Sequence, residues 1–324
     1  DVFEHAPYPA AHASTIVETA SGLVAAWFAG SREGRSDVSI WVARRDREHW
    51  LHPVEVADGR IAFRRRFPCW NPVLFQPPGA PLLLFYKVGP SPSRWWGMVM
   101  TSDDDGRSWS EPRRLPDGML GPIKNKPVLL PDGRLLCPSS DEEKRWRLHL
   151  EWTDAAAQRG RRGPALNVGR SFAAIQPTLL TYSGGRLQLL CRTRQGAIGE
   201  CWSEDGGETW TELLPTELPN PDSGIDAVTL ADGRALLIYN HSQTARTPLN
   251  LAVSTDGHDW AAVATLERQP GEYSYPAIIQ GSDGTIHLTY TWNRRRIRHL
   301  AISPDSFEMR PIVHGLWPDE RPQP

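Results

Sequence analysis

A repeated turn motif is the feature of this sequence that most restricts how the chain can fold. Three well-formed copies, which read Ser-x-Asp-x-Gly-x-x-Trp or one residue shorter, occupy residues 102–109, 203–210 and 254–260. Degenerate copies are centred on Asp46, Asp154 and Asp305, so the aspartates recur about every 50 residues after a longer first step. Self-similarity at a fixed period of roughly 20–50 residues is the signature of solenoids, propellers and repeat arrays.

A second repeat runs in phase with the first. Each unit has an apolar alternating segment, a glycine turn and another apolar segment, as in residues 127–136 and 227–239. Asp-Gly between alternating apolar runs is a strong hairpin signal, because the turn needs positive φ. Six such units account for most of the 324 residues, and four strands per unit is typical of propellers. The sequence therefore predicts an all-β fold, a single six-bladed β-propeller over residues 1–324 with four-stranded antiparallel blades. A β-helix or a stack of sandwiches is the alternative.

The turn motif itself is interpreted as structural. Its Ser and Asp can bond backbone N–H groups of the turn, its Gly can take the left-handed conformation, and its Trp can pack between sheets. The motif resembles a calcium loop superficially but lacks the further ligands and the terminal Glu of one. We therefore expect no metal ion and no cofactor.

Charge and hydropathy argue against two classes of partner. The 36 Lys and Arg residues nearly balance the 38 Asp and Glu residues, and no run of 18 apolar residues occurs. Nucleic-acid and anionic-membrane binding normally require a basic excess, and a membrane span requires a long apolar run. We therefore expect neither a nucleic acid nor a membrane as partner. Residues 1–4 lack the pattern of a secretory signal, and the compartment and the oligomeric state are left open.

Four cysteines are too few and too scattered for a disulfide framework or a zinc site. They are Cys69, Cys137, Cys191 and Cys201. We expect reduced, buried thiols, with a Cys191–Cys201 disulfide as the alternative.

Each inner strand of the predicted blades begins near a polar side chain. These side chains belong to His12, Asn71, Lys126, Gln176, Asp226 and Tyr275. Because inner strands line the axis of a propeller, we expect the six to converge on one central funnel. Convergent polar groups in a pocket are typical of a binding or catalytic site; a solvated pore mouth is the alternative.

The repeat and the residues around it resemble the sialidase (neuraminidase) superfamily over essentially the whole chain, in particular bacterial sialidase-like proteins with BNR repeats. Asp37 stands 25 residues after His12, in a Gly- and Ser-rich loop, where the resemblance implies an acid/base aspartate. Arg192 follows Gln176 by 16 residues, the family's spacing between a glutamate and a substrate-binding arginine.

Two further positions match the family and two depart from it. Arg246 precedes a strand and a turn motif, as another family arginine does, and Tyr275 stands eight residues before an Asp-Gly turn, as the nucleophilic tyrosine does. His12 replaces the first family arginine, and Gln176 replaces the glutamate that activates the tyrosine. Because an amide cannot accept the phenol proton, Glu272 or Asp226 would have to take that role.

The resemblance implies an exo-acting glycoside hydrolase that cleaves a terminal acidic sugar, sialic-acid-like or uronic, from a glycan. Arg192 and Arg246 would bind the sugar carboxylate, since planar guanidinium groups meet both oxygens. Tyr275 would be the nucleophile, because a carboxylate there would repel the sugar carboxylate by about 4 kcal/mol at 4 Å and an effective dielectric of 20. Asp37 would transfer the proton. His12 would supply a pH-dependent contact or act as acid/base.

The remaining candidates are expected to line the substrate site. They are Arg32, Asn71, Lys126, Asp226 and His241. Trp95 and Trp96 either stack on a sugar or pack between blades. The basic runs at residues 64–66 and 294–296 are expected to be solvated strand or turn faces.

Two other functions stay open at this point. One is a polysaccharide lyase acting on a uronate, with Tyr275 and His12 moving protons and Arg192 and Arg246 neutralising the carboxylate. The other is a glycan-binding propeller without catalysis. Hydrolysis adds water, whereas elimination creates a double bond that absorbs ultraviolet light, so one assay separates them.

Overall fold

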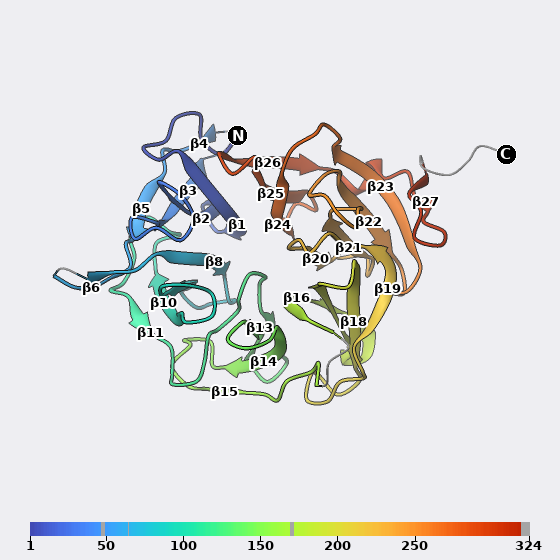
Figure 1. The fold of residues 1–324 in the computed structure, drawn as a ribbon, viewed down its shortest axis with the longest axis horizontal. Coiled ribbons are helices and arrows are strands. Elements are labelled where there is room, and N and C mark those ends of the chain that lie inside the picture. Colours follow the sequence, from blue (N-terminus) through green and yellow to red (C-terminus); the bar gives the residue numbers. More distant parts are fainter. Residues whose placement is uncertain (47–48, 64, 169–171, 319–324) are drawn as a thin grey trace.

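Six antiparallel sheets stand around a central axis in the computed structural model, which describes residues 1–46, 49–63, 65–168 and 172–318 (Figure 1). The predicted all-β, six-bladed propeller is confirmed. Helical structure in the described residues is confined to two short 3₁₀ turns, Ser183–Gly185 and Pro304–Ser306. None of the described residues forms a helix long and apolar enough to cross a membrane.

The sheets, numbered blades 1 to 6 in chain order, are built almost entirely from consecutive strands. Blade 1 contains β1 (Ala10–Thr19), β2 (Gly22–Gly30), β3 (Ser39–Asp46), β4 (His49–Trp50) and β5 (Val54–Ala57). Blade 2 contains β8 (Cys69–Phe75), β9 (Leu82–Val88), β10 (Trp96–Ser102) and β11 (Arg113–Arg114). Blade 3 contains β12 (Val128–Leu129), β13 (Leu135–Asp141), β14 (Arg147–Thr153) and β15 (Gly160–Arg162).

The second half of the ring repeats this plan. Blade 4 contains β16 (Ala174–Thr181), β17 (Leu187–Thr193), β18 (Ala197–Ser203) and β19 (Leu214–Pro219). Blade 5 contains β20 (Asp226–Thr229), β21 (Ala235–Tyr239), β22 (Leu249–Ser254) and β23 (Trp260–Glu267), and the late strand β27 (Arg310–Pro311) pairs with β23. Blade 6 contains β24 (Tyr273–Gln280), β25 (Ile286–Trp292) and β26 (Arg296–Ile302).

The first and last blades meet through the N-terminal segment. The amide of Val2 donates a hydrogen bond to the carbonyl of Ile297 in β26 at 2.8 Å, and the carboxylate of Asp1 pairs with Arg296 at 2.7 Å. β1 also contacts all three strands of blade 6. The N-terminal segment therefore covers the three-stranded blade 6 and closes the ring.

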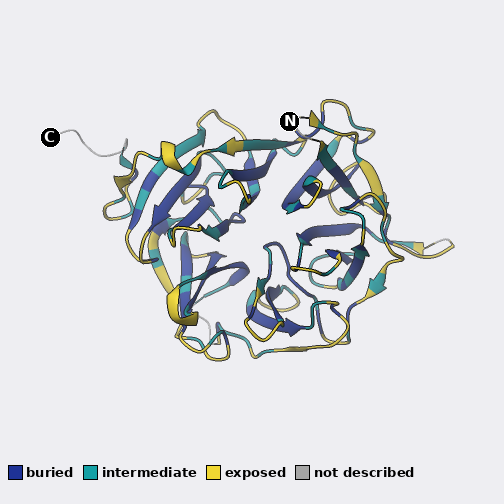
Figure 2. Cartoon of the chain, turned by 180° about the vertical axis from the view of Figure 1, so that it is seen from behind, coloured by how far each residue is buried: buried dark blue, intermediate teal, exposed yellow. Residues whose placement is uncertain are grey.

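Apolar clusters between neighbouring blades hold the ring together. Phe28 of blade 1 packs with Tyr86 of blade 2, and each of the other five junctions has its own buried cluster. Figure 2 shows the strands buried along most of their length, with exposed residues at outer edges and turns. Because a single sheet cannot bury both its faces, stability depends on the radial stacking.

The repeated motif clamps the turn between the third and fourth strands of a blade. Asp104 accepts hydrogen bonds from the amides of Arg107 and Ser108 at 3.0 and 2.8 Å, and the Ser102 hydroxyl accepts one from the Gly106 amide at 2.8 Å. In the next copy, hydrogen bonds from Thr209 lower the pKa of Asp205 to about 2. The structural interpretation of this motif is confirmed. Within the described ranges, no three metal-ligating side chains converge.

All four cysteines are buried free thiols. Burial raises the pKa of Cys201 to about 12, so this thiol stays protonated at neutral pH. The expectation of reduced thiols is confirmed, and the Cys191–Cys201 disulfide is not formed.

A β-bulge interrupts the inner strand of four blades. Ala13, Asn71, Gln176 and Tyr275 have φ of 59°, 36°, 54° and 50°, and the pairing register shifts at each. The last three precede proline, which offers no N–H to the ladder. Bulges re-aim side chains and are common beside active sites, and left-handed non-glycine residues cost about 1–3 kcal/mol each. Four inner strands therefore have a left-handed, strained residue at an equivalent bulge near the axis.

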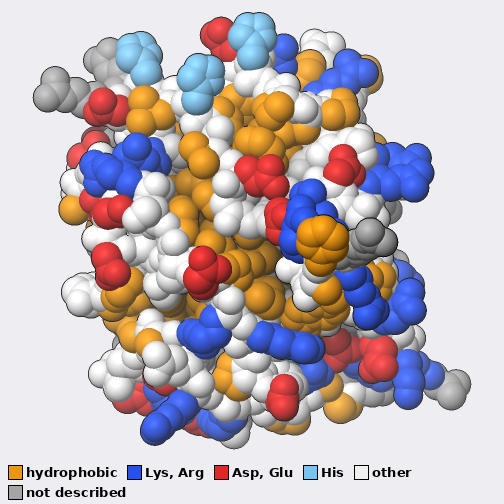
Figure 3. All heavy atoms as spheres, turned by 90° about the vertical axis from the view of Figure 1, so that its left-hand side faces the viewer, with side chains coloured by type: hydrophobic (Ala, Val, Ile, Leu, Met, Phe, Trp, Pro, Cys, Tyr) orange, Lys and Arg blue, Asp and Glu red, His pale blue; other side chains and the backbone are white. Residues whose placement is uncertain are grey.

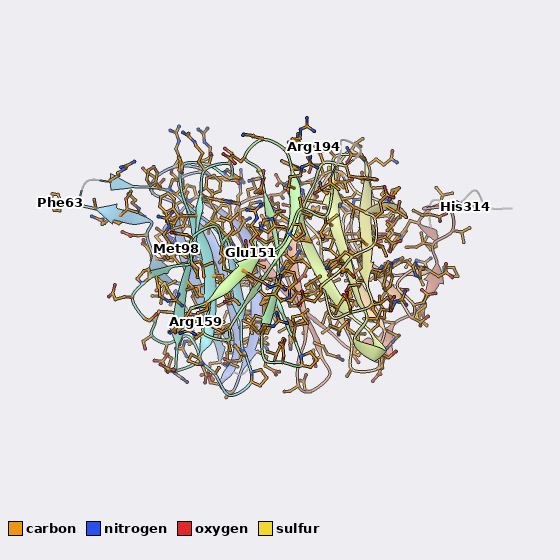
Figure 4. All side chains as sticks on the ribbon, turned by 90° about the horizontal axis from the view of Figure 1, so that it is seen from below. Phe63, Met98, Glu151, Arg159, Arg194 and His314 are labelled. Atoms are coloured by element: carbon orange, nitrogen blue, oxygen red, sulfur yellow. The ribbon has the colours of Figure 1, made fainter. Side chains whose placement is uncertain are left out.

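One hairpin projects from the ring. Strands β6 (Arg60–Ala62) and β7 (Arg65–Arg66) form it, and Phe63 lies at its tip (Figure 4). On the neighbouring outer surface, Lys and Arg side chains alternate with Asp and Glu, and apolar side chains lie between them (Figure 3). The predicted solvated face at residues 64–66 falls partly on Arg64, which lies outside the described residues.

Candidate functional site

The half-buried phenol of Tyr275 is the centre of the candidate site. Its oxygen accepts hydrogen bonds from Nη1 of Arg192 at 2.9 Å and from Nε2 of Gln176 at 3.2 Å. The same Arg192 nitrogen donates to Oε1 of Gln176 at 3.1 Å. These residues come from β24, β17 and β16, so the structure brings together three of the side chains that the spacing selected.

Arg192 is fixed from its other side by Asp222. Nε and Nη2 of Arg192 donate to Oδ1 of Asp222 at 2.9 and 2.6 Å. Burial disfavours the guanidinium charge, but Tyr275 and Asp222 outweigh it and raise the pKa of Arg192. Arg192 is therefore a rigid, permanently charged donor. Asp222 has φ of 56° in the loop before β20, and no sequence pattern had indicated it.

Arg246 and Arg294 form a second group of arginines, which share the carboxylate of Glu272. The guanidinium carbon of Arg246 lies 5.7 Å from the ring centroid of Tyr275, and its Nη1 donates to Oε1 of Glu272 at 2.9 Å. Nε of Arg294 donates to both oxygens of Glu272 at 2.9 and 3.0 Å, and Arg294 also pairs with Glu33. The paired arginines lower the pKa of Glu272 against the effect of its burial, so Glu272 is an anchor for cations.

The prediction of a solvated face at residues 294–296 is wrong for Arg294. Asn293 and Arg294 have φ of 50° and 54°, so the β25–β26 turn is left-handed. Arg294 is half-buried between the two carboxylates, whereas Arg295 and Arg296 are exposed. A run of three arginines after Asn is typical of a solvated turn. The sequence pattern does not indicate the left-handed conformation that directs Arg294 inward.

His12 lies against Tyr275 with their ring centroids 4.3 Å apart. Its Nδ1 shares a hydrogen bond of 3.1 Å with the hydroxyl of Thr291. Burial, reinforced by Arg294, Arg246 and Arg192, lowers its pKa well below the usual value. The imidazole is therefore neutral at physiological pH, which corrects the expectation of a pH-dependent cationic contact. Three arginines nevertheless act on this imidazole. One of them is Arg294, which lines the same cavity as His12, the residue that replaces the first arginine of the family pattern.

Asp37 lies at the rim on the loop after β2. Its carboxylate accepts hydrogen bonds from the amide and the hydroxyl of Ser31, both at 2.8 Å. These bonds outweigh the slight burial and lower the pKa of Asp37. Arg66, at the base of the projecting hairpin, donates to the Asp37 carbonyl at 3.2 Å. Asp37 is thus an exposed, ionised carboxylate on a braced loop.

A cavity of about 580 Å³ opens between this loop and the axis. Its walls include His12, Phe28, Arg32, Glu33, Trp70 and Arg294. Arg32 therefore faces the cavity, whereas Asp37 stands beside it. The mostly apolar walls with a few charged groups at one side are typical of a small-ligand site.

Lys126 and Asp226 meet each other instead of the phenol. Nζ of Lys126 lies 3.1 and 3.0 Å from the two oxygens of Asp226. The same carboxylate accepts hydrogen bonds from the Thr178 hydroxyl and the Ile278 amide, both at 2.9 Å. These contacts connect blades 3 to 6. Because its oxygens are occupied, Asp226 is a poor candidate for the base that would accept the Tyr275 proton in place of Gln176.

A buried lysine, Lys124, contacts the backbone of the residue that follows Tyr275. The segment before β12 runs toward the axis (Figure 1), and Nζ of Lys124 donates to the Asn125 side chain at 2.8 Å, to the Ile225 carbonyl at 3.0 Å and to the Pro276 carbonyl. Burial lowers the pKa of Lys124 to about 7. The pattern had pointed to Lys126 at this strand, because this segment departs from the repeat.

Asn71 and His241 are the remaining expected site residues. Asn71 is buried at the bulge of β8. His241 packs with Tyr239, whose hydroxyl is 2.6 Å from Nδ1, and with Trp317, whose ring centroid is 5.1 Å away. Burial lowers the pKa of His241 to about 4. His241 thus belongs to the packing of the C-terminal segment.

Comparison with known proteins agrees with this architecture. A family model described as a BNR repeat-like domain matches residues 21–288. No protein of curated function matches the chain by sequence.

Several solved structures are similar. A protein of unknown function from Dyadobacter fermentans has a TM-score of 0.74 and 16% identity, over 90% of this chain and 93% of that one. The NanB sialidase from Streptococcus pneumoniae has a TM-score of 0.76 and 12% identity, over 95% and 71% of the two chains. The intramolecular trans-sialidase from Ruminococcus gnavus has a TM-score of 0.73 and 14% identity, over 93% and 96%. At such identities the likeness shows the fold alone.

Proposed function

This chain belongs to the BNR repeat-like domain family and has a sialidase-like fold, and from this premise we propose that it binds and cleaves a terminal acidic sugar of a glycan as an exo-acting glycoside hydrolase. The sugar is sialic-acid-like or uronic. The observation that carries the proposal is the contact of Arg192 and Arg246 with the half-buried Tyr275, together with Arg294, which shares Glu272 with Arg246.

The arginines are suited to a carboxylate on the sugar. A planar guanidinium binds both oxygens of a carboxylate, and an ion pair is strongest where water is partly excluded. Asp222 and Glu272 hold Arg192 and Arg246 at their inner sides. The site therefore has its cations arranged before the ligand arrives, which reduces the ordering cost of binding.

Tyr275 is proposed to act at the anomeric carbon. A neutral phenol can approach a sugar that carries a carboxylate, and negative charge on its oxygen would be stabilised by Arg192 at 2.9 Å. Overall, hydrolysis breaks the bond from the anomeric carbon to the leaving oxygen, which takes a proton, and water supplies the hydroxyl that replaces it. Asp37, ionised at the rim, is proposed to take up the proton of that water and to pass it to the leaving oxygen, so that the two products together gain one water.

One observation favours a second candidate, β-elimination on a uronate. The described hydrogen bonds to the Tyr275 oxygen come from an amide and a guanidinium, and the neighbouring His12 is neutral. In such a reaction a base removes the proton next to the carboxylate, the arginines neutralise that carboxylate, and the leaving oxygen departs with a proton as the double bond forms.

The test is an incubation of the purified protein with glycans capped by sialic acid, glucuronic acid or galacturonic acid. Mass spectrometry distinguishes hydrolysis, in which the products gain one water, from elimination, in which they do not and in which ultraviolet absorbance rises. We expect hydrolysis at one of the caps, with the Tyr275→Phe variant inactive. Binding without cleavage would identify a glycan-binding propeller, and absence of both binding and cleavage would refute the acidic-sugar assignment.

A further inference from the structure

A second cavity, of about 340 Å³, opens beside the first. The loops after β9, β11 and β13 form its walls, and Pro92 lines both cavities. Since β8 begins at the end of the ring where the bulges lie, its antiparallel neighbour β9 ends there. Both cavities therefore open at the same end, where Arg194 projects in Figure 4, opposite the turn that holds Arg159. A ligand longer than one sugar would extend from the first cavity into the second.

The aromatic wall of this second cavity is held in place before any ligand binds. Trp96, at the start of β10, is half-buried, and its ring packs edge-on against Phe67 with centroids 5.6 Å apart and an interplanar angle of 89°. The guanidinium carbon of Arg114 lies 5.1 Å from the same indole. Pro92 and Pro116 add rigid apolar surface. Flat apolar groups of this kind suit the C–H face of a sugar ring.

The two cavities carry opposite charge. The first has Arg32 and Arg294 against Glu33, with further arginines beside it. The charged residues of the second are Arg114, Asp117, Asp141, Glu142, Glu143 and Arg162, four acids against two arginines. Asp141 and Arg162 pair with each other, so the remaining acids outnumber Arg114. Carboxylates accept hydrogen bonds from sugar hydroxyls, but they repel a second anionic sugar.

Glu142 connects the two cavities. It lines the second cavity, yet the charges that act on it include Glu33, which lines the first cavity, and Arg192, which contacts the phenol. Burial raises the pKa of Glu142 despite Arg192 and Arg194. Glu142 therefore lies at the boundary between the two cavities, where its carboxyl group can accept a hydrogen bond from a sugar hydroxyl.

Resting on the proposed function, we propose that the second cavity binds the sugar on the leaving-group side, and that it selects a neutral, hydroxyl-rich sugar over a second acidic one. The protein then acts on acidic caps that are joined to neutral glycans. Homopolymers of acidic sugars are poor ligands, because their second residue meets Glu142 and Glu143.

The test compares three uncleavable ligands by titration calorimetry. They are sialic acid alone, thio-linked 3′-sialyllactose and a thio-linked sialic acid dimer, with glucuronate counterparts run in parallel. We expect sialyllactose, or its glucuronate counterpart, to bind roughly ten-fold tighter than the acidic monosaccharide, as an aromatic stacking contact would give. The acidic dimer is expected to bind no tighter than the monosaccharide.

Variants assign the effect to the cavity. Trp96→Ala should reduce the ratio of trisaccharide to monosaccharide affinity to about one, and Trp96→Phe should restore part of it, which excludes a general loss of fold. The double variant Glu142→Gln with Glu143→Gln should tighten binding of the acidic dimer several-fold. Glu204→Gln, an exposed carboxylate paired with Arg186, is the control and should change nothing.

The outcomes separate this inference from the function on which it rests. Equal affinity for all three ligands, or an unchanged ratio in Trp96→Ala, would overturn the leaving-group subsite while leaving acidic-sugar binding intact. Arg246→Ala should weaken all three ligands and leave their ratio unchanged. If no ligand binds the unmodified protein in either series, the acidic-sugar assignment and the subsite fall together.

Discussion

Nη1 of Arg192 lies 2.9 Å from the phenol oxygen of Tyr275, although 83 positions and two blades separate these residues in the chain. The contact exists because β24 is the inner strand of blade 6, while Arg192, on the second strand of blade 4, extends its side chain to Gln176 of the inner strand β16 and to the phenol. A permanent cation at the phenol oxygen favours any state in which that oxygen carries negative charge.

Replacing Tyr275 with Phe therefore tests the chemistry apart from the binding. Phe keeps the ring against His12 and below Arg246 but removes the oxygen. We expect cleavage to fall at least about 100-fold, while affinity for the acidic sugar changes by less than about three-fold. Rates with a reactive aryl glycoside and calorimetric affinities measure the two effects. Equal activity of the variant and the unmodified protein would remove Tyr275 from the mechanism.

Arg294 offers a test with a matched neighbour. Arg294→Gln removes a half-buried guanidinium from the first cavity, whereas Arg295→Gln removes an exposed one from the same turn. A charge-assisted hydrogen bond is worth about 1.5–3 kcal/mol, so we expect affinity for the acidic sugar to fall roughly ten- to 100-fold in the first variant. The second should bind normally. Equal effects of the two would mean that Arg294 acts only through the net charge.

Much of this site could be predicted from sequence, and the missing part has a physical reason. The 50-residue period fixes which segments become inner strands, and so Tyr275 and Gln176 could be expected to meet, whereas Arg192 was indicated only by the resemblance to sialidases. Arg294 and Asp222 belong to loops whose left-handed residues are not glycine. Such loops look like ordinary polar turns in a sequence, and only their backbone conformation turns the side chains inward.

Lys124 was missed for a different reason. The segment before β12 leaves the repeat and sends a lysine to carbonyls of blades 5 and 6. Long-range contacts of this kind are not encoded by periodicity, so the repeat pointed to Lys126 instead.

The stability of the protein should fall in mild acid because of His12. The pKa of this imidazole is lowered in the folded state relative to about 6.5 in the unfolded chain. The unfolded state therefore binds the extra proton, so the stability is fully present above about pH 6.5 and is lost as the pH falls below it. The free energy of unfolding at pH 5 should therefore be lower than at pH 7.5. Urea unfolding at pH 7.5 and 5.0 should show a smaller loss in His12→Gln; an identical loss would refute the assignment.

Lys124 predicts a pH dependence of binding. Burial brings its pKa to about 7, with Asp226 favouring its charge and Lys126 and Arg192 opposing it. As the pH rises from 6 to 8, the site loses a positive charge, and affinity for the acidic sugar should fall several-fold.

Two variants isolate that charge. Lys124→Arg keeps a cation that does not titrate near neutrality, so its affinity should be flat over the same range. Lys124→Met should be flat as well, but weaker at pH 6, and circular dichroism checks that it folds. Calorimetry across this range gives the answer, and a persistent pH dependence in both variants would place the titrating group elsewhere.

Asp37 offers a strict test of the proposed hydrolysis, because its surroundings favour only one of its two possible roles, proton acceptor or proton donor. Two hydrogen bonds from Ser31 lower its pKa, so at neutral pH it can accept a proton but is a weak donor. If it serves as the base for water, Asp37→Asn should reduce turnover by about 100-fold or more, since positioned proton transfer contributes roughly that much. The loop should stay folded, because the amide oxygen still accepts from Ser31.

Asp58→Asn, which alters a carboxylate at the base of the projecting hairpin, is the control and should retain activity. On the acidic side, turnover of the unmodified protein should decline as the pH drops below the ordinary range of a carboxyl pKa, about 4, and this acidic limb should vanish in Asp37→Asn. If Asp37→Asn keeps both the turnover rate and the acidic limb of the pH profile, Asp37 is not the base. Glu33, the carboxylate that lines the first cavity, would then be the next candidate.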